Sequence, residues 1–151
     1  MPVRTAFRSL GLIVLWLTGC HQAPSDRSGA PAIVGAWIVR APEAPFPLHM
    51  FVFHSDGTVQ QSNPDAGDPD TSDSNLMGAW VADAGGFKGK VIEITADRTT
   101  HQFVSRGEIS FALKVSGNAF SGTAHAVFYD VNGRQVRGPL QARLEGERVL
   151  P

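Results

Sequence analysis

Four histidines are the first candidates for chemistry, because imidazole binds metals and titrates near neutral pH. They are His49, His54, His101 and His125. His49 and His54 fall in one predicted strand at odd spacing, so the two-residue alternation of a strand places them on opposite faces. One metal ion could bind both only with ligands from other strands. We therefore predict no metal site, and we interpret these histidines as surface residues or as side chains with one hydrogen-bond partner.

A polar stretch at residues 63–75 is the second candidate. It contains four aspartates and two asparagines, and calcium prefers such oxygen ligands. It lacks the alternating ligands, central glycine and closing glutamate of an EF-hand loop. Because aspartate and asparagine are also ordinary turn residues, we predict a solvated loop without a metal. Its length suggests a lid over a pocket.

Motifs for catalysis are absent from the sequence. It has no Ser-His-Asp order, nucleophile elbow, phosphate-binding loop or His-Glu-x-x-His. Glu93, Glu108 and Glu145 are carboxylates that could act as acids or bases, but their spacing singles out none of them. The sequence therefore indicates no reaction, and we expect no cofactor.

Cys20 is the only cysteine, which excludes a disulfide within the chain and a cysteine site elsewhere in the fold. It follows two arginines and an apolar run, residues 10–17, that is too short to span a bilayer stably. The sequence Leu-Thr-Gly-Cys at 17–20 resembles the lipobox of bacterial lipoproteins. This resemblance implies that residues 1–19 are a signal peptide, and that Cys20 receives a diacylglyceryl group and is usually acylated at its new amino terminus.

The same resemblance implies a location. In Gram-negative bacteria, an aspartate after the lipidated cysteine tends to retain a lipoprotein in the inner membrane, and His21 stands there instead. We therefore expect an outer-membrane lipoprotein that faces the periplasm and contacts the membrane through its lipid anchor. The small, polar and proline-containing residues up to 32 predict a flexible tether over 20–32.

Composition and charge narrow the partners of the remaining domain, residues 33–150. Apolar residues make up 42% of the chain and charged residues 18%, as in an ordinary globular protein. Without the signal peptide, 11 basic residues stand against 14 acidic ones, a formal charge of −3. No basic stripe is present to bind nucleic acid, which we exclude as a partner.

Periodicity predicts strands and no long helix. Apolar residues at 109, 111, 113 and 115 alternate with polar or small ones, as on a strand with one buried face. Asp56-Gly57 and Asn132-Gly133 are typical of hairpin turns. The predicted strands are 33–40, 47–54, 57–62, 77–83, 89–96, 100–106, 108–116, 119–129 and 135–148.

Short connections between these strands predict an all-β fold, an antiparallel up-and-down β-barrel of about eight strands. Closure of the barrel would leave no exposed strand edges. A short internal sequence repeat supports repeated hairpins, because Gly35-Ala36-Trp37 recurs as Gly78-Ala79-Trp80. A barrel of this size is either filled by side chains or holds one small ligand.

The sequence Gly35-Ala36-Trp37 resembles the Gly-x-Trp of the first strand in lipocalins and the wider calycin group. The resemblance implies that Trp37 closes one barrel end, under a basic residue of the last strand, Arg143 or Arg148. The other lipocalin signature regions, the C-terminal helix and a disulfide are missing from this sequence. We therefore predict a calycin-like architecture, with allene-oxide-cyclase-like barrels as the rival.

These observations favour a binding protein for a small apolar or amphipathic molecule, or for another envelope component. One alternative is a barrel enzyme, an isomerase or cyclase resembling allene oxide cyclase; another is a filled barrel with a structural role. A cavity would argue against the filled barrel, and an ionisable side chain of strongly shifted pKa inside it would favour the enzyme. The predicted ligand-binding residues are Trp37, Phe51, Phe53, Trp80, Phe103, His125, Tyr129 and Arg143.

Overall fold

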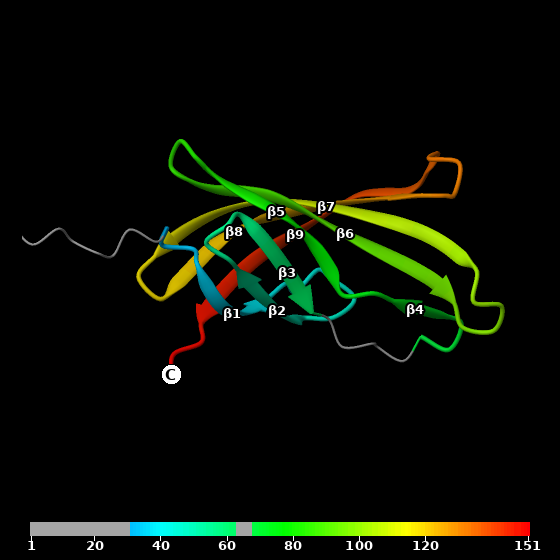
Figure 1. Cartoon of the computed structure of the whole chain (residues 1–151), viewed down its shortest axis with the longest axis horizontal. Helices are drawn as coiled ribbons and strands as arrows, with labels where there is room; N and C mark the ends of the chain where they lie inside the picture. The colour runs from blue at the N-terminus through cyan, green and yellow to red at the C-terminus, as the bar shows by residue number, and fades with distance from the viewer. Residues whose placement is uncertain (1–30, 63–67) are drawn as a thin grey trace, which may run out of the picture.

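The computed structural model describes residues 31–62 and 68–151, which form nine β-strands (Figure 1). The strands are β1 (Gly35–Arg40), β2 (Leu48–Phe53), β3 (Thr58–Ser62), β4 (Thr71–Asp73), β5 (Leu76–Asp83), β6 (Gly86–Asp97), β7 (Phe103–Ser116), β8 (Ala119–Tyr129) and β9 (Gln135–Arg148). No helix in this part of the chain is long and apolar enough to cross a membrane.

Eight of the strands form a closed antiparallel barrel. The neighbours in order are β1, β2, β3, β5, β6, β7, β8 and β9, and β9 pairs back to β1. Each strand lies beside the next barrel strand in the sequence, which is the up-and-down arrangement. This confirms the predicted all-β barrel, an architecture compatible with that of the calycins. The predicted signal peptide and most of the tether lie outside the described residues.

The ninth strand, β4, corrects the prediction of a loop over residues 63–75. Thr71–Asp73 pairs with Thr95–Asp97 of β6, beyond the point where β5 stops pairing with that same strand. The amide of Ser74 also donates to the carbonyl of Ile94 at 2.9 Å. Strand β6 is longer than β5, so its unpaired backbone groups favour this extra pairing despite the polar sequence. Residues 63–67 lie outside the described residues.

Strand β7 corrects a second boundary, because the segments predicted at 100–106 and 108–116 form one strand. Gly107 lies inside it, opposite Glu93 of β6. A Cβ on Gly107 would be 3.0 Å from the ring of Phe128, so this glycine marks a close approach and not a turn. The turn instead follows Asp97, whose carboxylate accepts hydrogen bonds from the amides of Thr99 and Thr100.

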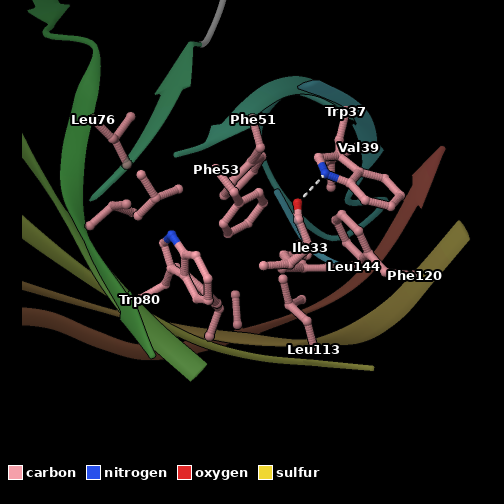
Figure 2. Close-up of a cluster of buried hydrophobic side chains, with 14 of the residues drawn as sticks. Ile33, Trp37, Val39, Phe51, Phe53, Leu76, Trp80, Leu113, Phe120 and Leu144 are labelled. Carbon is pink, nitrogen blue, oxygen red and sulfur yellow. Dashed lines mark hydrogen bonds between the residues drawn. The ribbon is translucent and has the colours of Figure 1, made fainter. Parts of the chain in front are cut away.

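Apolar side chains fill the barrel at the end where β1 begins, on the left in Figure 1. Figure 2 shows how they converge from β1, β2, β5, β7 and β8. We call this the closed end and define it by Trp37, Phe53, Trp80, Phe120 and Arg148. The opposite end of the barrel, where β1 runs into β2, is called the open end.

Trp37 is fully buried in the closed end. Its indole donates to the carbonyl of Ile33 at 2.8 Å (Figure 2), and the ring of Phe120 lies 5.0 Å away between centroids. The guanidinium of Arg148 lies 4.2 Å from the centre of the indole and donates to the carbonyl of Val34 at 2.7 Å. This confirms that a basic residue of the last strand covers Trp37, and it selects Arg148.

Gly35 makes this arrangement possible. Its φ is +133°, and a Cβ there would lie 2.7 Å from the guanidinium of Arg148. Both facts favour glycine over any other residue. The Gly-x-Trp sequence therefore has a physical role here, because its glycine leaves room for the cation that covers its tryptophan.

The internal sequence repeat also has a structural counterpart, because its two tryptophans are buried in similar ways. Trp80 lies at the same end as Trp37, and its indole donates to the carbonyls of His54 and Thr58 at 3.1 and 3.0 Å. The ring of Phe53 lies 6.4 Å from it, edge to face. Both tryptophans thus bury their rings and give their N–H groups to backbone carbonyls, which satisfies a buried donor.

Candidate binding cavity

The open end contains a cavity of about 750 Å³. Its apolar wall comes from inward-facing side chains of the barrel strands. Apolar members of this wall include Phe51, Leu76, Ile109, Phe111 and Leu144. The barrel is therefore hollow at the open end. Only the closed end is filled by side chains, as the filled-barrel alternative predicted for the whole barrel.

Small residues on β8 and β9 create the hollow. Ala124 and Ala126 face it from β8, and Ala142 faces it from β9 directly opposite Ala124. Near the closed end the same two strands carry Phe120 opposite Gly146, and the phenyl ring occupies the space that a Cβ on the glycine would need. Large side chains thus fill one end of these strands, and alanines leave volume at the other.

His49 of β2 and Gln61 of β3 form a polar pair in the cavity wall. Both are buried, and Gln61 Nε2 lies 3.1 Å from His49 Nδ1. The amide nitrogen of Gln61 can donate to His49 Nδ1 when that ring nitrogen carries no proton. The pair gives the cavity groups that orient a polar ligand atom.

Glu93 of β6 and Asp73 of β4 form an acidic pair on another part of the wall. Burial of Glu93 is the largest cause, and together with the nearby Asp73 it raises the pKa of Glu93 from 4.5 to about 7. Two carboxyl groups that share a site favour a proton between them. Glu93 can therefore exchange a proton near neutral pH.

The other charged groups of the wall have local partners. Glu43 accepts from the Arg143 side chain at 2.8 Å, and hydrogen bonds from Arg143 lower the pKa of Glu43. Asp68 accepts from the amides of Asp70 and Thr71, which lowers its pKa. Hence both carboxylates are stabilised in their ionised form by the protein itself, without a ligand.

Two basic groups also line the cavity. Arg137 lies at its exposed rim with its guanidinium 5.4 Å from the centre of the Phe128 ring. His49 is the other. In the described chain, no group of three or more His, Cys, Asp or Glu side chains has the arrangement of a metal site.

The structure brings few of the predicted ligand-binding residues into the cavity. Phe51 lines it. Trp37, Phe53 and Trp80 face the barrel interior but belong to the core. Phe103 is 41% exposed at the start of β7.

The three polar members of the predicted set lie on outward-facing positions of their strands. His125 and Arg143 are exposed, and Arg143 pairs with Glu43 at the protein surface. Tyr129 is half-buried with the Arg106 guanidinium 5.3 Å from its ring centre. None of these three contributes to the wall of the cavity.

Sequence reasoning named Glu93 only as one of three carboxylates that nothing singled out, and Asp73 only as part of the polar stretch 63–75. It did not consider Gln61, and it gave His49 no ligand role. A signal for three of them was present. His49 is in phase with Phe51 and Phe53 along β2, and Glu93 is in phase with Val91 along β6. A polar residue in phase with buried apolar ones faces the barrel interior, and Gln61 follows Val59 in the same way.

No protein family matches the chain, and neither a curated protein nor a solved structure matches it significantly. The architecture therefore rests on strand order and pairing, and the candidate site rests on its own geometry.

Proposed function

We propose that this chain is a lipid-anchored cell-envelope protein whose calycin-like barrel binds one small apolar or amphipathic molecule. The observation that carries the proposal is the cavity at the open end. Its volume of about 750 Å³ falls within the range of small-molecule sites, roughly 300–1,000 Å³. Its wall is mainly apolar with a few polar groups, the usual composition of a ligand site.

Filling the cavity tests this proposal. Ala124 is buried and lines it, so Ala124→Phe places a ring in the volume available to a ligand. We expect the wild-type chain to bind one molecule of 1-naphthalenemethanol, a neutral bicyclic probe, and the variant to lose at least tenfold in affinity. Equilibrium dialysis of the full chain measures this, with the same detergent buffer lacking protein as the blank.

The matched control is Ala112→Phe, because Ala112 is exposed on the outer face of β7. This variant should bind the probe as the wild type does. If the wild type binds no probe, or if both variants lose it equally, the cavity is not a ligand site.

The anchoring part of the proposal depends on Cys20 and on the lipobox resemblance of residues 17–20. We expect the membrane-extracted protein to begin at Cys20 and to carry acyl mass. Cys20→Ser should abolish this mass and leave precursor or protein without a lipid. Intact-mass spectrometry decides the question, and a mature wild-type chain without acyl mass would contradict lipidation. Membrane fractionation then tests the proposed outer-membrane location.

An enzyme is the second candidate, and Glu93 is the observation that favours it. A carboxyl group with a pKa of about 7 in a cavity can give or take a proton at neutral pH, as an isomerase or cyclase requires. We expect the wild type to speed deuterium exchange from D₂O into the methyl group of bound 1-acetonaphthone, and Glu93→Gln to remove this acceleration. Equal exchange rates with the two proteins would leave only the binding function.

A further inference from the structure

The carboxylates of the cavity wall differ in whether a cation or backbone N–H groups compensate their negative charge. Glu43 and Asp68 are engaged with Arg143 and with backbone amides, respectively. Asp73 and Glu93 instead line the same cavity close enough for Asp73 to raise the pKa of Glu93. Among residues 31–62 and 68–151, no lysine or arginine forms an ion pair with either of these two.

This arrangement is unfavourable when both carboxyl groups are ionised. Asp73 is exposed and Glu93 is partly buried, so it is the Glu93 carboxylate that loses hydration on ionisation and needs an opposite charge or a proton in compensation. Glu93 takes the proton in the empty cavity, where burial and Asp73 raise its pKa to about 7. A positively charged group beside the two carboxylates would replace that proton.

The rest of the wall suits an apolar body. Leu76 belongs to β5, which pairs with β6 as β4 does. The rings of Phe51 and Phe111 lie 6.3 Å apart, edge to face. Aromatic rings accept both apolar groups and the alkyl groups next to an ammonium. An anionic ligand would meet the acidic pair, and Arg137, which also lines the cavity, is exposed like Asp73.

We propose that the cavity selects an amphipathic cation, an amine or quaternary ammonium on an apolar body, and holds its charge against Asp73 and Glu93. This inference rests on the proposed binding function and specifies the chemical class of its ligand. It also predicts how the ligand is oriented, with its charged group beside the two carboxylates and its apolar body against the apolar wall.

Three probes with the same bicyclic body and different charges test it. They are 1-naphthylmethylamine, 1-naphthalenemethanol and 1-naphthylacetate, which are cationic, neutral and anionic at pH 7.5. Equilibrium dialysis of the full chain should give the tightest binding for the amine and the weakest for the acetate. Glu93→Gln should lower the affinity for the amine about ten- to a hundredfold, the range for losing a hydrogen bond to a charged group, and change that for the alcohol less than threefold.

Asp73→Asn is the second variant, and Glu147→Gln is the matched control because Glu147 is exposed on the outer face of β9. Asp73→Asn should also weaken the amine selectively, and the control should bind all three probes as the wild type does. Calorimetry in two buffers of different ionisation enthalpy adds an independent readout. At pH 7, binding of the amine should release about half a proton, because Glu93 is then half protonated.

The outcomes separate the inference from the proposed function. If the alcohol binds, but the amine binds no more tightly and releases no proton, the cationic ligand class is wrong while the binding function stands. If Glu93→Gln weakens all three probes equally, Glu93 acts on the fold and the inference also fails. If none of the probes binds the wild type, both the inference and the proposed function fail.

Discussion

The two ends of this barrel use the same strands in different ways. At the closed end, inward positions carry large rings that contact one another, such as Trp37 with Phe120 at 5.0 Å between centroids. At the open end, corresponding positions of β8 and β9 carry Ala124, Ala126 and Ala142, and a cavity remains. Size at inward positions thus decides whether a layer of the barrel becomes core or pocket.

Polar groups differ between the ends as strongly as size does. The indole N–H groups of Trp37 and Trp80 and the guanidinium of Arg148 all donate to backbone carbonyls, so these polar groups of the closed end find their partners within the fold. The open end holds His49 and the Asp73–Glu93 pair in its wall. We infer that the closed end supplies stability, and that the open end gives up some of it to keep polar groups and empty volume in a cavity.

The largest effect should come from the closed end. Trp37→Ala removes a fully buried indole and should lower the free energy of unfolding by about 3–5 kcal/mol, the range for deleting a large buried aromatic. Urea denaturation followed by circular dichroism measures it. Ile38→Ala is the control, since Ile38 is 49% exposed on the same strand. An unshifted midpoint for Trp37→Ala would break the distinction between the two ends.

An intermediate effect is expected for the cation that covers Trp37. Arg148→Gln removes hydrogen bonds to the carbonyls of Val34 and Ala32 and the contact with the indole. Together these losses should lower the free energy of unfolding by about 2–3 kcal/mol. Arg143→Gln, on the exposed outer face of the same strand, should lower it far less, because it removes only an exposed ion pair with Glu43. Equal effects in urea denaturation would show that Arg148 is only a surface charge.

The smallest effect should appear at the open end and depend on pH. The pKa of Glu93 is raised from 4.5 to about 7, so the folded state binds more protons than the unfolded state between these values. The contribution of Glu93 therefore favours folding at low pH and is lost as the pH rises to about 7. Above it, the ionised group destabilises the fold.

Glu93→Gln should accordingly stabilise the chain by about 1–2 kcal/mol at pH 8, once the full value of the shift is reduced for partial exposure to solvent. At pH 5 the gain should be much smaller. Urea denaturation at the two pH values measures the difference, and Glu147→Gln should show none. A gain that does not grow with pH would mean that Glu93 is ionised without cost.

Sequence reasoning reached the fold further than it reached the site. Period-two alternation and turn dipeptides fixed the barrel and nearly all strand positions, because these signals are local. Strand β4 was missed because its pairing depends on the length of β6, which lies over twenty residues away. Gly107 was read as a break because a glycine shows its role only when the ring that crosses it, Phe128, is known.

The site was harder because its residues meet only through the barrel. Asp73 and Glu93 come from β4 and β6, and the first of these strands was not predicted at all. Large aromatics were preferred as ligand contacts, and most of them form the core instead. The informative feature of the sequence was the small size of the inward-facing alanines of β8 and β9, which leave the cavity empty.

The pairing of β9 with β1 brings both ends of the barrel's chain to the closed end, since β1 starts there and β9 finishes there (Figure 1). If Cys20 carries a lipid, as we propose, the anchor joins the barrel at this end, only fifteen residues before Gly35. The cavity mouth lies at the opposite end of the barrel from this attachment. The segment that leads to the lipid would therefore join the barrel away from the mouth and would leave the mouth open to a ligand.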